Sequence, residues 1–305
     1  WETSTKLIQQ VERLQPDVAH FHGFIFPVLL IRFVKRIRIR SKVVVEYHSD
    51  PVFKKMKGLQ RKSLKMADRL IFANLDAATL WSKQLNLEES HWRLNIECAP
   101  SDKFMDRTQA RSITGFNGQP VFLWCSRLIA RRDPLTVLAG YEQFLQTRKY
   151  PDSHFYWMIP DWDIALLTAL KDKIASSELL TKATTLITER KPHHELAPFF
   201  NSADYLLSGS KEDGYGYAAA DAMSCGVIPI VTDIATFRQI TNNGEVGALW
   251  KAGDASHLKA VLEETIAQTF PSIKTSSNSV KSHFDASLSA SAQANQLVKI
   301  YDELF

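Results

Sequence analysis

Short apolar runs rich in β-branched residues alternate along this chain with longer segments that carry the period of an amphipathic helix. Such alternation is typical of α/β proteins, in which helices connect buried parallel strands. The sequence therefore predicts two doubly wound sheets, each built from one series of strands. The expected strands are 17–22, 42–48, 69–73 and 92–98 in the first series, and 121–125, 154–159, 184–187, 203–207 and 228–232 in the second.

A looser stretch between the two series marks the expected domain boundary, because Pro100, Gly115, Gly118 and Pro120 lie there among polar residues. Near the C-terminus, a Ser-rich connection at 272–291 is expected to lead into the last helix. The expected parts are an N-terminal Rossmann-like domain at 1–115, a second at 116–288, and a C-terminal helix at 289–305 that packs back toward the first.

Composition narrows the class of protein. The 305 residues are 45% hydrophobic and 23% charged, the balance of a soluble globular protein. Three widely spaced cysteines, Cys98, Cys125 and Cys225, argue against a disulfide framework or a zinc site, and Cys125 is expected to be a small buried thiol. From this cysteine usage we expect a reducing, cytoplasmic compartment, and no signal peptide is visible.

Basic residues concentrate in 31–42, interleaved with apolar ones. One interpretation is a membrane-surface helix that makes peripheral contact with the cytoplasmic face of a membrane. The other is a solvated helix face that leads into a strand. Nucleic acid is not an expected partner, because the net charge is only +4 and no recognised binding motif occurs.

The stretch 208–226 carries the most chemical information. Gly214 and Gly216 form a turn between the strand 203–207 and a helix, and a glycine turn at a helix N-terminus suits a phosphate group. Asp213 precedes the turn, and Asp221 interrupts an otherwise apolar helix. A carboxylate there is costly unless sugar hydroxyls or a basic neighbour satisfy it. Two interpretations stay open: ligand binding, or a capping Asp213 and an ion-paired Asp221.

The residues from Asp213 to Asp233, with Asp221-Ala-Met-Ser-Cys-Gly226 at their centre, resemble the signature of the large retaining glycosyltransferase family numbered four, also called group 1. The loop Ser126–Pro134 resembles that family's Gly-Arg-Leu loop. The resemblance implies a GT-B fold, with an N-terminal domain truncated in this chain. It also implies transfer of a sugar from a nucleoside diphosphate sugar to a saccharide or lipid-linked hydroxyl acceptor, with retention, as in cell envelope polysaccharide biosynthesis.

The resemblance also implies roles for single residues. Arg127 and Arg132 would clamp the donor diphosphate, as guanidinium groups grip phosphate oxygens bidentately; the alternative is a surface basic cluster. Asp213 would hold the sugar hydroxyls and Asp221 the ribose. The turn at Gly214, Tyr215, Gly216 and Tyr217 would cradle the donor, and His48 would line the acceptor side.

No metal and no cofactor other than the donor substrate are expected. Asp161-Trp-Asp163 imitates the metal motif of GT-A enzymes, but its surroundings match GT-B. His20 and His22 lie on the strand before that of His48, without an evident set of metal partners. Aspartates replace both signature glutamates, so an alternative is a catalytically weak subunit that binds a nucleotide sugar or a partner protein. The family's interdomain glycine is also missing from 99–102.

Overall fold

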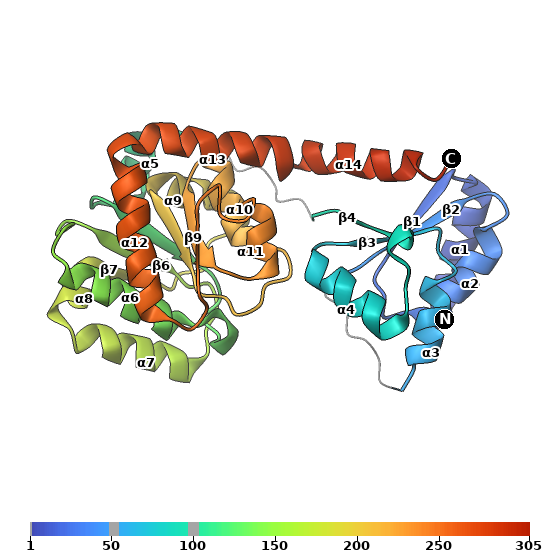
Figure 1. The fold of residues 1–305 in the computed structure, drawn as a ribbon, viewed down its shortest axis with the longest axis horizontal. Coiled ribbons are helices and arrows are strands. Elements are labelled where there is room, and N and C mark those ends of the chain that lie inside the picture. Colours follow the sequence, from blue (N-terminus) through green and yellow to red (C-terminus); the bar gives the residue numbers. More distant parts are fainter. Residues whose placement is uncertain (1, 49–54, 97–103) are drawn as a thin grey trace. The chain divides into compact units, whose positions relative to one another are not determined.

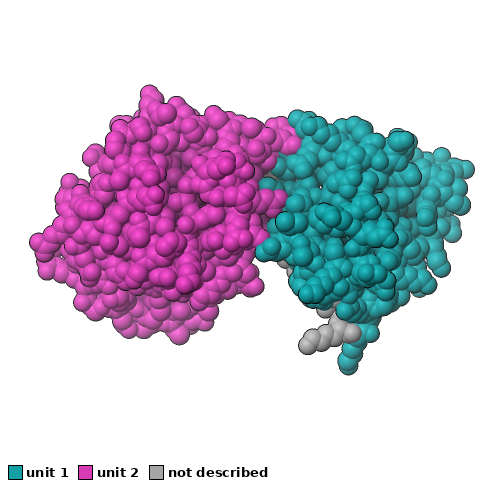
Figure 2. Space-filling view, in the orientation of Figure 1, with its two compact units in different colours: residues 1–97, 293–305 teal, residues 98–292 magenta. Residues whose placement is uncertain are grey.

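The computed structural model describes residues 2–48, 55–96 and 104–305 and divides the chain into two compact units. Unit 1 comprises residues 1–97 and 293–305, and unit 2 comprises 98–292 (Figure 2). Each unit contains one sheet with all its strands parallel. The expected α/β class is therefore confirmed.

Unit 1 has a four-stranded sheet in the order β1-β2-β3-β4 (Figure 1). Successive side chains of a strand point to opposite faces, so each strand contributes to two clusters. Val43 and Val45 pack in the larger core, whereas Val44 packs with Ile71 and Ile300 on the other face. The strands are β1 (Val18–His22), β2 (Lys42–Glu46), β3 (Arg69–Phe72) and β4 (Trp92–Leu94), and the helices are α1 (Glu2–Leu14), α2 (Pro27–Ile37), α3 (Lys57–Leu64) and α4 (Leu75–Leu85).

The last helix, α14 (Ala290–Asp302), supplies unit 1 with residues distant in sequence. Ile300 is buried against Val44 and Ile71, and Arg93 Nη2 lies 2.7 Å from Glu303 Oε2. These contacts explain why residues 293–305 belong to the same unit as β1–β4.

Unit 2 has a six-stranded sheet in the order β10-β9-β8-β5-β6-β7. From β5 the chain runs outward to β6 and β7, then returns to β8 on the opposite side of β5. Such a reversal is a topological switch point, where open parallel sheets bind ligands at the carboxyl ends of the strands. The strands are β5 (Val121–Cys125), β6 (His154–Met158), β7 (Thr184–Ile187), β8 (Tyr205–Ser208), β9 (Ile228–Thr232) and β10 (Ala248–Trp250). The helices are α5 (Arg107–Thr114), α6 (Pro134–Gln146), α7 (Ile164–Ala175), α8 (Glu178–Ala183), α9 (Ala197–Ser202), α10 (Tyr217–Ser224), α11 (Ala235–Ile240), α12 (Ala255–Thr269) and α13 (Ile273–Ser287).

The expected domain boundary at 115/116 is wrong, because α5 belongs to unit 2. Arg107 Nη1 lies 3.1 Å from Asp204 Oδ1, and Arg111 Nη2 lies 2.9 Å from Asp204 Oδ2. Asp204 is buried just before β8, so these ion pairs tie α5 to the second sheet. The division at 97/98, together with Cys98, Pro100 and the segment 99–102, lies outside the described residues.

The Ser-rich stretch expected as a connection forms a helix, α13. Ser277, Val280 and Phe284 are buried along it, at the spacing of one helix face. Packing of this face outweighs the weak helix propensity of the serines.

The basic segment 31–42 forms the end of α2, a turn and the start of β2. Phe33, Val34 and Ile37 are buried in the unit 1 core, whereas Ile39 is 91% exposed. The structure thus shows a solvated helix face leading into a strand, and membrane contact through the basic residues stays a prediction. Among the described residues, no helix combines the length and apolar character that a bilayer crossing requires.

Candidate functional site

A cavity of about 240 Å³ lies at the carboxyl ends of β5 and β8 in unit 2. This is the switch point of the sheet, the place where the topology favours a ligand. The predicted residues that line it are Arg127, Arg132, Asp213, Gly216 and Tyr217.

The start of α10 forms one wall of this cavity. Gly216 precedes the helix with φ of +71°, a left-handed conformation that glycine adopts without strain. The first N–H groups of a helix have no intrahelical partners and lie at the positive end of its dipole. Tyr217 and Ala218 line the cavity ahead of Ala219, whose N–H is the first to bond within the helix, so these features favour an anion there.

Arg132 and Asp213 form the polar centre of the cavity. Arg132 Nη1 donates to Asp213 Oδ2 and, at 2.8 Å, to Ser210 Oγ. Asp213 Oδ1 accepts from the N–H of Gly216 at 3.1 Å and so closes the turn that precedes α10. Among the described residues, the buried Nε of Arg132 has no hydrogen-bond partner, and an unsatisfied buried charged donor is costly.

Gly209 brings the loop after β8 against the loop after β5. A Cβ atom at this position would lie 2.5 Å from Val137 Cγ2 and 2.9 Å from the carbonyl oxygen of Arg132. No sequence motif marks Gly209, because its φ is not in the left-handed region and only the tertiary approach of the two loops requires glycine.

Arg127 lies at the rim of the cavity. Its Nε donates to Asp161 Oδ2 at 2.9 Å, and both side chains are 59% exposed. Asp163 accepts from the N–H of Leu166 at 3.0 Å and thereby caps α7. The two carboxylates of the Asp161-Trp-Asp163 motif thus serve an ion pair and a helix cap.

Asp221 lies on α10 but does not line the cavity. Gly214 and Tyr215, which precede α10, do not line it either. The carboxylate of Asp221 is buried, and its Oδ2 lies 3.3 Å from Nε2 of His193. The structure therefore shows the basic neighbour that the second interpretation of Asp221 required. The sequence pattern did not single out His193. What could have indicated it is that a carboxylate on an apolar helix requires a basic partner.

His48 belongs to unit 1, unlike the other predicted site residues. Its Nε2 lies 2.7 Å from Nδ1 of His22 and 3.9 Å from Oε2 of Glu46. His20, His22 and His48 were evident as histidines of neighbouring strands, whereas no sequence pattern indicated Glu46, which lies near all three.

The cysteines differ in part from expectation. Cys225 is buried, but Cys125 is only partly buried and lines the cavity of unit 2. Both are thiols, whereas Cys98 lies outside the described residues. Cys125 is the last residue of β5 and borders the cavity, which explains why its side chain is only partly buried.

Comparisons with known proteins agree with this architecture. Sucrose-phosphate synthase from Thermosynechococcus elongatus superposes with a TM-score of 0.74 at 17% identity, covering 100% of this chain and 78% of that one. A glycosyltransferase from Rickettsia africae superposes with a TM-score of 0.80 at 14% identity, covering 99% and 80%. The fold is that of the GT-B glycosyltransferases.

A third GT-B structure carries a nucleotide. Anabaena HepE in complex with UDP has a TM-score of 0.73 at 14% identity, covering 98% of this chain and 82% of that one, and HepE is also known in complex with UDP-glucose. By sequence, residues 167–279 match the family described as glycosyl transferases group 1. The matched segment includes Asp213, α10 and His193. No curated protein matches the chain by sequence.

Proposed function

We propose that the protein is a group 1 glycosyltransferase that moves a sugar from a nucleoside diphosphate sugar to a hydroxyl acceptor, with retention of anomeric configuration. The observation that carries the proposal is the Arg132 side chain, which lines the cavity at the N-terminus of α10 and whose Nε has no hydrogen-bond partner among the described residues. A guanidinium beside a helix N-terminus is a strong site for a diphosphate. The group 1 match at 167–279 supports the same chemistry.

The donor's leaving group sets what this site must do. As the bond to the anomeric carbon breaks, negative charge builds on the departing diphosphate and the sugar becomes oxocarbenium-like. Arg132 and the N–H groups at the start of α10 would stabilise that charge, with Arg127 contributing from the rim. These fixed charges would act without a divalent ion at the diphosphate.

Asp213 and Asp221 would act at either side of the diphosphate. Asp213 holds Arg132 in place and would also meet sugar hydroxyls, while Asp221 with His193 would bind the ribose. The turn from Gly214 to Tyr217 would cradle the donor. The ring centroids of Tyr215 and Tyr217, both on this turn, lie 5.4 Å apart. His48 would line the acceptor side.

A uridine diphosphate sugar is the first donor to test, because HepE, of the same fold, binds UDP and UDP-glucose. We propose a saccharide or lipid-linked acceptor and a cytoplasmic role in cell envelope polysaccharide synthesis. Transfer requires that water be excluded from the site, because water would otherwise hydrolyse the donor.

A thermal-shift titration with UDP, GDP, ADP and their common sugars tests the donor site. A ligand that binds only the folded state raises the melting temperature by linkage. We expect one nucleotide to stabilise the protein, and Arg132→Ala to abolish the shift. Arg131→Ala is the matched control, because Arg131 is exposed and lies 3.9 Å from Glu212, outside the cavity lining. The proposal fails if no nucleotide stabilises the protein, or if both variants respond alike.

A further inference from the structure

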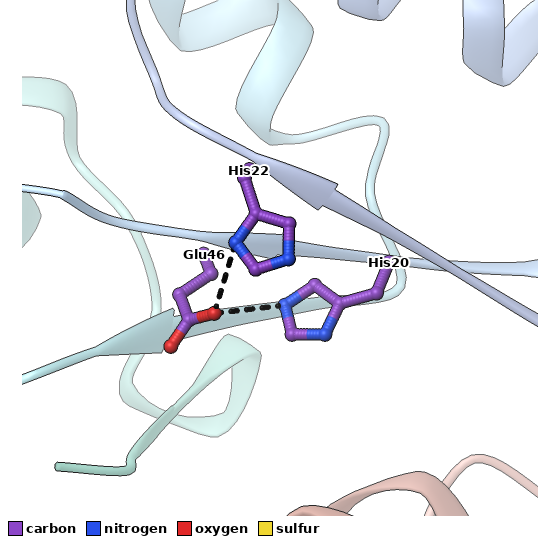
Figure 3. A group of neighbouring side chains, drawn as sticks. All are labelled: His20, His22 and Glu46. Atoms are coloured by element: carbon purple, nitrogen blue, oxygen red, sulfur yellow. Dashed lines mark ion pairs between the residues drawn. The ribbon is translucent and has the colours of Figure 1, made fainter. Parts of the chain in front are cut away.

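Three side chains of unit 1 converge on one face of its sheet: His20 and His22 from β1, and Glu46 from β2 (Figure 3). Residues two apart on a strand share a face, which places both histidines on the same side. The parallel register pairs His22 with Glu46, so the carboxylate lies beside the imidazoles. The convergence follows from strand pairing, which joins residues more than twenty positions apart in sequence.

The ligand atoms have the spacing of a metal site. Glu46 Oε2 lies 3.4 Å from His20 Nε2 and 3.3 Å from His22 Nδ1. One ligand atom from each residue lies within 4.8 Å of the other two. Ligands about 2.1 Å from a zinc ion in tetrahedral geometry lie about 3.4 Å from one another.

The other ring nitrogen of His20 has a hydroxyl partner. Its Nδ1 lies 2.7 Å from the hydroxyl oxygen of Tyr301, on the C-terminal segment of unit 1. When Nδ1 donates to that oxygen, Nε2 keeps its lone pair and faces Glu46. Within the part of the chain that the structure describes, this buried Nε2 has no hydrogen-bond partner. Metal-bound histidines characteristically have such a partner on their other nitrogen.

The burial of the group also suits a cation. Glu46 is buried at 8% exposure, where a carboxylate requires a compensating charge. His22 is 59% exposed and leaves a route from solvent.

We propose that His20 Nε2, His22 Nδ1 and Glu46 Oε2 bind a divalent transition-metal ion, with zinc as the best match. Two histidines and one glutamate with an open fourth position are a recurrent catalytic zinc arrangement. Imidazole ligands disfavour magnesium and calcium, which take oxygen ligands. His48 Nε2 lies 3.9 Å from Glu46 Oε2, beside the three proposed ligands. Metal binding replaces the hydrogen bond between His22 Nδ1 and His48 Nε2.

The test uses the full chain treated with a chelator and then titrated with Zn²⁺ by calorimetry and with Co²⁺ by visible absorption. We expect one equivalent of metal and the intense absorption of tetrahedral cobalt. His22→Gln and Glu46→Gln should each weaken binding at least tenfold. Tyr301→Phe, which keeps all three ligands, should weaken it about 10–100-fold, the usual effect of removing the partner of a ligating histidine.

The matched control is His194→Gln, because His194 is 81% exposed and lies 3.7 Å from Glu195 in the other unit. This variant should bind metal as the wild type does. Circular dichroism in chelator shows that each variant folds. The proposal is overturned if the wild type shows no saturable binding, or if a folded Glu46→Gln variant keeps the wild-type affinity.

X-ray absorption of the zinc-loaded wild type gives a test that needs no variant. Two imidazoles and oxygen ligands are expected, and a sulfur ligand would contradict the assignment. Arg132→Ala should bind zinc with unchanged stoichiometry, since Arg132 belongs to unit 2. A failure of the nucleotide site and a failure of the metal site are therefore distinguishable.

Discussion

Arg132 and Asp213 are 81 residues apart in sequence, yet their side chains form an ion pair at the centre of the unit 2 cavity. Only 17% of the Arg132 side chain and 14% of the Asp213 side chain are exposed. Removing one partner of such a pair leaves an uncompensated, mostly buried charge, which costs more than breaking an exposed pair.

Asp213→Asn should therefore lower the free energy of unfolding by about 1–3 kcal/mol, since it leaves a mostly buried guanidinium without its anion. Asp161→Asn is the matched control, because it breaks the exposed pair with Arg127. That change should cost less than about 1 kcal/mol. Urea unfolding of both variants measures the difference, and equal costs would contradict the assigned role of the buried pair.

Replacing Asp213 by glutamate tests whether the aspartate supports full activity or marks a catalytically weak protein. A glutamate carboxylate would extend about 1.5 Å further, one C–C bond, into the space that Arg132 and the Gly216 N–H define. We expect Asp213→Glu to lower the rate at which the donor is cleaved to nucleotide and sugar by about tenfold or more, since small misplacements of reacting groups are costly in catalysis. A large gain in turnover, in this variant or in Asp221→Glu, would instead support the catalytically weak subunit.

Gly209→Ala should separate the two loops that form the cavity. The added Cβ would approach Val137 Cγ2 to 2.5 Å and a backbone oxygen to 2.9 Å, so the backbone must move. We expect a loss of about 1–3 kcal/mol in stability, as for other overpacked sites, together with weaker nucleotide binding. Gly58→Ala is the control, because a Cβ there meets nothing within 4 Å. Unchanged nucleotide affinity in Gly209→Ala would show that the loops tolerate separation.

Asp204→Asn tests why α5 belongs to unit 2. Asp204 is 3% exposed, pairs with Arg107 and Arg111, and accepts from the N–H of Val121 at 2.8 Å. Removing a charge from a buried pair typically costs about 3–5 kcal/mol. Chemical unfolding should show a loss of this order, whereas the exposed Asp172→Asn should change stability by less than about 0.5 kcal/mol. A small effect at Asp204 would mean that apolar packing alone holds α5.

His154 should make stability depend on pH. Burial lowers its pKa below the ordinary value of 6.5, so the folded state resists protonation. As the pH falls below about 6.5, the unfolded state takes up the proton more readily, and the free energy of unfolding decreases. Above that pH the contribution is complete and constant.

His154→Gln should remove part of this slope while keeping a polar partner for Thr185, whose Oγ1 lies 2.8 Å from Nε2. Urea unfolding of the wild type and the variant between about pH 5 and 8 measures the difference. The exposed His194→Gln should leave the slope unchanged. Parallel curves for wild type and His154→Gln would contradict the prediction.

The sequence by itself determined the class of fold and indicated where the candidate site lies. Apolar runs such as Val121–Cys125 can be buried only as strands covered on both faces, so local pattern was sufficient. The glycine turn before α10 and the arginines after β5 were likewise evident, because parallel strands present their carboxyl ends on one edge. Segments whose state depends on packing were not evident, such as α13 with its serines and α5 with its ion pairs.

Only the tertiary structure decided which side chains meet. Asp213 pairs with Arg132, His193 with Asp221, and Glu46 with two histidines, each across loops or strands that are distant in sequence. Hydrogen bonds and ion pairs depend on distances of a few ångströms, which follow from strand register and loop packing. A sequence pattern shows that a buried charge needs a partner, and only the folded chain selects which partner it has.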